Sequence, residues 1–117
     1  MNINLDYTSR IPIYEQIVNE IERFVSLGIL KEKEQILSIR DLARNLGINP
    51  NTVKKAYDVL ESKKVIVSLS TKGTFISDDV NKIKNNTIDN YINDIKLIMN
   101  RLNKLGIDNK DILDRLR

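Results

Sequence analysis

Apolar residues recur at intervals of three and four positions in four stretches of this chain, which is the spacing of amphipathic helices. The first helix is predicted from Pro12 to near Leu27 and Gly28. Its apolar face is broad and comprises Ile13, Tyr14, Ile17, Val18, Ile21, Phe24 and Val25. The ten residues before it are mostly polar, and we expect a polar lead-in. The first helix is expected to pack behind the helices that follow.

Two shorter helical patterns come next, joined by a tight turn. Ser38 can cap the first, and Gly47 stands where a helix commonly ends in a left-handed residue. Asn49 can cap the second, with Pro50 at the first position, where no N–H is needed. The apolar positions are Ile39, Leu42, Ala43 and Leu46 in the first helix and Val53, Ala56, Tyr57 and Leu60 in the second. Helix, three-residue turn and helix form a helix-turn-helix, which places its second helix in the DNA major groove.

A β-hairpin is predicted after these helices. Residues 65–69 alternate and are β-branched, residues 70–73 supply a turn with Gly73, and residues 74–77 form a second strand. A hairpin in this place is the wing of a winged-helix domain. Lys72 in the turn is placed to reach a phosphate or the minor groove, although an ordinary exposed lysine fits the pattern equally well. The connector over residues 28–37 can hold a short strand around residues 35–37.

The fourth stretch, from Asn81 onward, has heptad spacing. Its apolar positions are Ile88, Tyr91, Ile95, Ile98, Leu102 and Leu105, widened by Ile92 and Met99. Gly106 ends this helix, and Asp108 caps a shorter one with Ile112, Leu113 and Leu116 on its apolar side. The stripe either folds back on its own domain or pairs with a second copy. We favour pairing, because a winged-helix domain already covers its own core.

These patterns predict a mainly α fold with a small β-hairpin (α+β). Residues 1–79 form a winged helix-turn-helix domain and residues 80–117 a two-helix dimerisation tail. With 117 residues, 41% of them hydrophobic and 30% charged, the composition fits one small globular domain with an appendage.

Composition also narrows the function classes. Cysteine and histidine are both absent, which rules out disulfides, argues against zinc and removes the commonest general base. No phosphate-cradling glycine loop or clustered carboxylate pair is present, so we expect no enzyme, metal or cofactor. No run approaches the ~20 apolar residues of a membrane span, and the first residues lack a signal-peptide core. We expect a cytoplasmic protein with no membrane partner.

Positive charge is concentrated on the helix-turn-helix and beyond it. Residues 1–37 carry four basic and six acidic side chains, whereas residues 38–77 carry seven basic and three acidic ones. This distribution favours a polyanionic partner. An ordinary solvated surface explains the charge alone equally well, but basic residues fall on the exposed side of the second helix.

The motif order resembles a known family. SIRDLARNLGINPNTVKKAYDVLESKKVI followed by STKGTFI is similar to the DNA-binding domain of GntR-family bacterial transcription regulators, over about residues 11–77, and IPIYEQI is similar to that domain's first helix. The tail of about 38 residues is too short to enclose the ligand pocket of larger effector domains. It resembles the YtrA-like subfamily, which implies a dimerising tail and repression of a transporter operon.

The resemblance implies DNA contacts in three places. They are Arg40 on the first helix of the pair; Asn49, Asn51, Thr52 and Lys54 on the second; and Lys72, Gly73 and Thr74 at the wing. Lys55 and Arg44 are further, weaker candidates for DNA contact, because each also fits a solvated face, and capping alone explains Asn49. Helix N-terminal N–H groups with Asn and Thr side chains independently suit phosphate and base-edge hydrogen bonds.

Three pairs of residues depart from the family pattern. Glu32 and Lys33 replace Pro-Gly in the connector, Ile36 and Leu37 replace Leu-Pro before the capping serine, and Ser70 and Thr71 replace Arg-Gly at the start of the wing. We expect the connector changes to affect the rigidity of the connector. We expect the wing changes to leave minor-groove contact mainly to Lys72.

The leading hypothesis is a homodimeric repressor that binds a pseudo-palindromic operator in double-stranded DNA and controls a transporter or neighbouring operon. The alternative is a winged-helix module that binds protein without specific DNA binding. No residues in the sequence converge on an effector site. A small molecule in a cleft between tail and DNA domain, or control by abundance or by an accessory partner, stays open.

Overall fold

The computed structural model describes the whole chain, residues 1–117. The chain forms two compact units, Met1–Ile83 and Lys84–Arg117, which we describe separately. The junction lies inside a helix, beyond the boundary expected after Asp79. Val80 is buried in the core of the first unit, which is why that unit extends into the helix.

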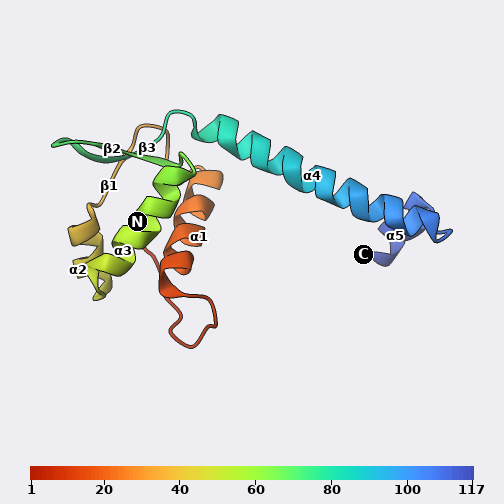
Figure 1. Cartoon of the computed structure of the whole chain (residues 1–117), viewed down its shortest axis with the longest axis horizontal. Coiled ribbons are helices and arrows are strands. Elements are labelled where there is room, and N and C mark those ends of the chain that lie inside the picture. Colours follow the sequence, from red (N-terminus) through yellow and green to blue (C-terminus); the bar gives the residue numbers. More distant parts are fainter. The chain divides into compact units, whose positions relative to one another are not determined.

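Three helices form the body of the first unit (Figure 1). They are α1 (Ile13–Ser26), α2 (Ile39–Leu46) and α3 (Pro50–Ser62). Each turns its predicted apolar face inward, and the side chains at the centre are fully buried. These are Ile17, Ile21, Leu42, Val53 and Leu60. The apolar spacing therefore located all three helices and their packing faces.

A small antiparallel sheet completes the first unit. Its strands are β1 (Gln35–Ile36), β2 (Ile66–Leu69) and β3 (Gly73–Ile76), in the order β1-β3-β2. The predicted hairpin and the short connector strand are confirmed. Gly73 belongs to β3 and pairs with Leu69, although we had placed it in the turn. The pairing of β1 with β3, with Gln35 opposite Phe75, was not predicted.

The prediction of a polar lead-in was wrong. Ile3 is buried in the core and Met1 and Leu5 pack against it. Gln16 on α1 fixes the segment that follows, because its side-chain amide donates to the carbonyls of Asp6 and Ile11, both at 2.9 Å, and its Oε1 accepts from the Asp6 N–H at 2.9 Å. Met1, Ile3 and Leu5 alternate with two asparagines, which is a period-2 signal, but it extends over only five residues and the prediction overlooked it.

Lys33 in the connector has a left-handed backbone conformation. Its φ is +65°, and its N–H donates to the carbonyl of Ile76 at 2.8 Å. The conformation is therefore imposed by the connection to β3. A glycine, which the resembled family typically has at this position, adopts positive φ without this strain.

Lys33→Gly is expected to stabilise the first unit by about 0.5–1 kcal/mol. Left-handed φ costs a residue with a Cβ roughly 1–2 kcal/mol, and glycine removes this strain from the folded state. Glycine also has greater conformational freedom in the unfolded chain, which offsets part of the stabilisation. Urea unfolding measures the difference. Lys31→Gly is the matched control, since Lys31 lies in the same connector without a positive φ. Equal stability of the two variants would contradict the strain at Lys33.

The second unit comprises the rest of α4 (Val80–Lys104) and α5 (Asn109–Arg115). Gly106 has φ +90°, and the side chain of Asp108 caps α5 by accepting from the Asp111 N–H at 2.9 Å, so both predicted signals are confirmed. Of the apolar side predicted for α5, Ile112 is buried while Leu113 and Leu116 are exposed. No helix has both the length and the apolar character required to span a bilayer.

Candidate nucleic-acid interface

The turn between α2 and α3 is built by the predicted capping residues. Ser38 Oγ accepts from the Asp41 N–H at 3.1 Å at the start of α2. Gly47 ends α2 with φ +67°. Asn49 Oδ1 accepts from the Asn51 N–H at 2.8 Å, and Pro50 follows as the first residue of α3. The Thr52 N–H donates to the Asn49 carbonyl at 3.0 Å, so Asn49 accepts from both N–H groups that follow Pro50 and fixes the first turn of α3.

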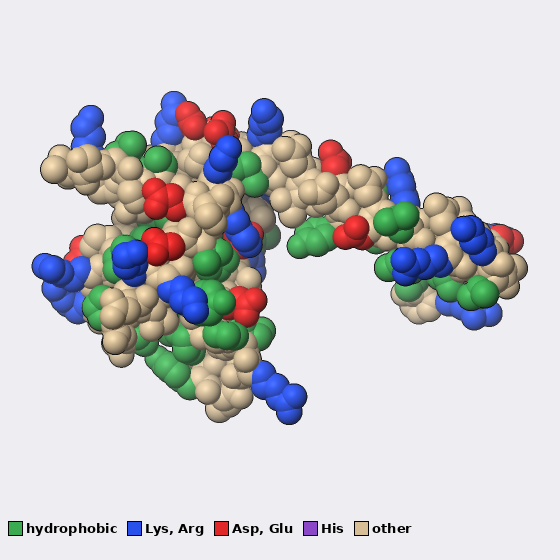
Figure 2. All heavy atoms as spheres, viewed as in Figure 1, with side chains coloured by type: hydrophobic (Ala, Val, Ile, Leu, Met, Phe, Trp, Pro, Cys, Tyr) green, Lys and Arg blue, Asp and Glu red, His purple; other side chains and the backbone are tan.

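Helix α3 has one buried and one polar face. Val53, Ala56, Tyr57 and Leu60 are buried, as the spacing predicted. The opposite side presents exposed polar side chains together with the half-buried Thr52. The exposed ones are Asn51, Lys54, Lys55 and Asp58. In Figure 2, Lys and Arg side chains lie over the region of α2 and α3, with acidic side chains between them.

The cations of α2 and α3 differ in how they are held. Lys54 Nζ lies 2.8 Å from Asp58 Oδ2, and Arg44 lies 3.7 Å from the Asp41 carboxylate. Arg40 is exposed and takes part in neither pair. Exposed pairs of this kind contribute at most about 1 kcal/mol, so both are readily exchanged for contacts with phosphate.

Lys55 has a structural contact of its own. Its Nζ lies 4.1 Å from the centroid of the Tyr14 ring, which places a cation–π contact between α3 and α1. Lys55 thus adds an exposed contact between two helices that already pack through the core. This contact has no signal in the sequence, because the two residues lie far apart along the chain.

Asp58→Asn is expected to raise the affinity for random-sequence DNA by about two- to fivefold, because it removes a negative charge from the polar face of α3 and frees Lys54 for phosphate. Competition binding with random duplexes measures it. Glu15→Gln is the control: it makes the same change of charge on an exposed residue of α1, outside the interface. An equal gain in both variants would assign the effect to net charge rather than to Asp58.

Tyr57 ties α3 to the residue that precedes the cap of α2. Its hydroxyl donates to the carbonyl of Leu37 at 2.6 Å, and the side chain is buried. Burial raises the pKa of the Tyr57 hydroxyl well above its usual value, so the group stays protonated and keeps donating. The apolar spacing predicted only that Tyr57 is a core residue. Its hydrogen bond could not be predicted, because the acceptor is a backbone carbonyl 20 positions away.

The wing turn comprises Ser70, Thr71 and Lys72. The Lys72 N–H donates to the Leu69 carbonyl at 2.7 Å, and the Lys72 side chain is exposed. Gly73 and Thr74 follow directly on β3 and are half-buried. The three predicted wing residues therefore lie together at the tip of the hairpin.

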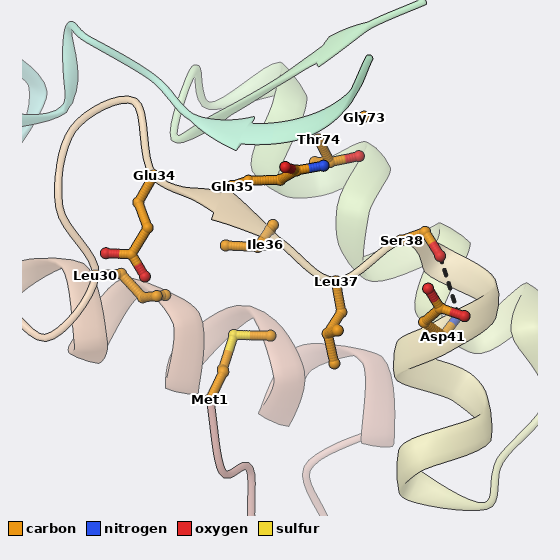
Figure 3. Close-up of a pocket in the computed structure, with 10 residues that line it drawn as sticks. All are labelled: Met1, Leu30, Glu34, Gln35, Ile36, Leu37, Ser38, Asp41, Gly73 and Thr74. Atoms are coloured by element: carbon orange, nitrogen blue, oxygen red, sulfur yellow. Dashed lines mark hydrogen bonds between the residues drawn. The ribbon is translucent and has the colours of Figure 1, made fainter. Parts of the chain in front are cut away.

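A hollow of about 450 Å³ lies between the wing and the start of α2. Ser38 and Asp41 line it on the helix side, and Gly73 and Thr74 line it on the sheet side (Figure 3). The helix-turn-helix and the wing thus border one hollow of the first unit.

This arrangement corresponds to a family of known proteins. Residues 13–76 match the family described as bacterial regulatory proteins, gntR family, and this range covers more than half of the chain. The chain belongs to the GntR family. The predicted resemblance and the winged helix-turn-helix fold are confirmed, and so is the expectation that the protein is not an enzyme, because GntR proteins are regulators.

Individual GntR relatives agree with this assignment. Over 77 residues, which are 66% of the chain, the sequence is 42% identical to the HTH-type transcriptional repressor YtrA of Bacillus subtilis (strain 168). The match covers 59% of YtrA, so the chain spans about three fifths of that relative.

Two solved structures extend the comparison. A transcriptional regulator from Oenococcus oeni superimposes with a TM-score of 0.75 at 34% identity, covering 96% of this chain and 93% of that one. The DNA-binding domain of AraR, in complex with operator ORE1, gives a TM-score of 0.55 at 25% identity, covering 66% of this chain and 94% of AraR's. The first similarity includes the tail, and the second is to a domain seen on DNA.

Proposed function

We propose that this GntR protein is a sequence-specific DNA-binding transcription regulator that reads a pseudo-palindromic operator as a homodimer. The observation that carries the proposal is the first turn of α3. Its cap and Pro50 fix the helix start, and the side chains of Asn51 and Thr52 stand there with neither held in a side-chain pair. Such a turn, presented by a helix-turn-helix, suits base edges in the major groove.

Each candidate residue has a chemical role in this proposal. Asn51 can pair bidentately with adenine, at about 1–3 kcal/mol of discrimination per good contact, and Thr52 can bond to a base edge or pack on a thymine methyl. Arg40, Lys54 and Lys55 neutralise phosphates, which supplies affinity at any sequence. Asn49 acts through its cap, which fixes the first turn of α3, rather than through a contact of its own side chain with DNA. Lys72, Gly73 and Thr74 bring the wing to the backbone or the minor groove.

The homodimer is supported by the apolar stripe of α4. Six of its eight members are 45–77% exposed in the single chain, and Met99 and Leu102 are half-buried. The exposed ones are Ile88, Tyr91, Ile92, Ile95, Ile98 and Leu105. Apolar side chains exposed over this length need to be buried against another apolar surface. The same stripe on α4 of a second copy, related by a two-fold axis, provides that surface.

Two copies held in this way would place two α3 helices on half-sites about one helical turn, roughly 34 Å, apart. Repression follows if the operator overlaps a promoter, in line with the name of YtrA as a repressor. We propose the same action here, on a transporter or neighbouring operon in the cytoplasm. A small-molecule effector is not needed for this proposal.

Selection from a random library of 30-base-pair duplexes tests the function. Enriched duplexes are expected to contain inverted half-sites and to bind about a thousandfold more tightly than bulk DNA at physiological salt. A chain that retains no duplex better than bulk competitor would overturn the proposal. Salt-insensitive capture of a protein, with no retention on DNA, would favour the winged-helix interaction module instead.

A further inference from the structure

One side chain connects the short strand β1 to the wing turn. Gln35 points from β1 toward β3, and its Nε2 donates to the backbone carbonyl of Lys72 at 3.2 Å. Figure 3 shows the Gln35 side chain extended next to Gly73 and Thr74. The contact joins residues 37 positions apart, one in the connector and one at the tip of the hairpin.

The end of the Gln35 side chain lies close to the backbone of Gly73. Gly73 has φ +119°, and a Cβ built there would lie 2.6 Å from Gln35 Nε2. A side chain at this position would displace the end of the flexible Gln35 side chain, and the positive φ of Gly73 is a conformation that favours glycine. Gly73 therefore leaves room for the Gln35 amide at the place where it bonds to Lys72.

The turn itself has few internal restraints. Ser70 has φ +40°, and the turn is closed by the bond between the Lys72 N–H and the Leu69 carbonyl. Ser70, Thr71 and Lys72 are all exposed and have no apolar anchor in the core. The bond from Gln35 is thus the side-chain contact that fixes the turn against the rest of the first unit.

We propose that Gln35 is a positioning residue for DNA binding: it holds the wing turn on β1 and so sets where the Lys72 ammonium meets the DNA backbone. The proposal rests on the proposed function. It goes beyond that function because Gln35 is not expected to touch DNA itself. One residue separates β1 from Ser38, so the same short strand fixes both the wing and the start of α2.

Two effects follow from a loss of this bond. The Lys72 side chain would start from a mobile backbone, and fixing it on DNA would then require ordering the turn as well. The fold should be little affected, because the bond is exposed and β1 keeps its pairing with β3. The effect should therefore appear in DNA affinity through Lys72 and not in stability.

Gln35→Met, which keeps the length of the side chain and removes the donor, tests the proposal. In the free protein, exchange of the Lys72 amide, which is bonded to the Leu69 carbonyl, is expected to accelerate by about tenfold, with exchange in α3 unchanged. Unaltered exchange in the wing turn would overturn the proposal without any DNA being present.

A double-mutant cycle with Lys72→Ala then tests the link to DNA, using the library-selected duplex and a random one. Lys72→Ala alone should weaken both by about fivefold and reduce the salt slope by about one. Gln35→Met should weaken binding by about two- to fivefold in the wild type and by less than about 1.5-fold in the Lys72→Ala background.

The outcomes separate the two proposals. An equal loss from Gln35→Met in both backgrounds, or no loss in either, would overturn the positioning role while leaving DNA binding intact. Failure of the unmodified chain to prefer any duplex would instead remove the proposed function.

Discussion

Ile95→Asp is expected to convert the proposed dimer into a monomer and to weaken operator binding by about a hundredfold or more. Ile95 lies in the middle of the α4 stripe and is 51% exposed in the single chain. A carboxylate there would be buried without a partner in the paired state, which costs several kcal/mol. Loss of the second recognition helix removes the gain from linked half-sites, typically about 10²- to 10⁴-fold.

Leu97→Asp is the matched control for this prediction. Leu97 lies on the same helix and is 59% exposed, but it is two residues from Ile95 and therefore points away from the stripe. Sedimentation equilibrium should show a dimer for Leu97→Asp and a monomer for Ile95→Asp. The dimer account is wrong if Ile95→Asp still sediments as a dimer, or if both variants dissociate to the same extent.

Thr52→Ala is expected to reduce the preference for operator over random DNA by about tenfold, because it removes a base contact and leaves phosphate contacts in place. The affinity for random duplexes should hardly change. Thr52 is half-buried at the first turn of α3. Its side chain takes no part in the cap formed by Asn49, so the cap remains intact in Thr52→Ala. Titration of both duplexes at one salt concentration measures the ratio.

Arg40→Ala provides the contrast for Thr52→Ala. It should weaken operator and random DNA by a similar factor, about five- to tenfold, with a salt slope lower by about one. Its exposed guanidinium takes part in no ion pair of α2, so its removal should leave the fold intact. The assigned roles are wrong if Thr52→Ala weakens all duplexes alike while Arg40→Ala changes only the preference.

The sequence predicted the parts of the fold that depend on local chemistry. Ser38, Gly47 and Asn49 act through neighbours within a few positions, so cap and turn rules located both helices of the pair. The buried face of α3 followed from 3.6-residue spacing. The wing followed from alternation around a glycine-containing turn.

The contacts that sequence reasoning missed join residues far apart in the chain. Neither Tyr57 with the carbonyl of Leu37 nor Gln35 with that of Lys72 has a sequence signal, because a backbone carbonyl is the same at every position. The packing of Ile3 was missed because the alternation of Met1, Ile3 and Leu5 is only five residues long. The DNA and dimer residues remain predictions, since they concern partners that the single chain does not contain.

Amide chemical shifts of the ¹⁵N-labelled chain, titrated with its selected operator, test the central claim most directly. The account predicts the largest changes at residues 51–55 of α3, with a second group at residues 71–74 of the wing. Operator binding that leaves residues 51–55 unchanged would contradict it, because the first turn of α3 would then not be the part that reads DNA.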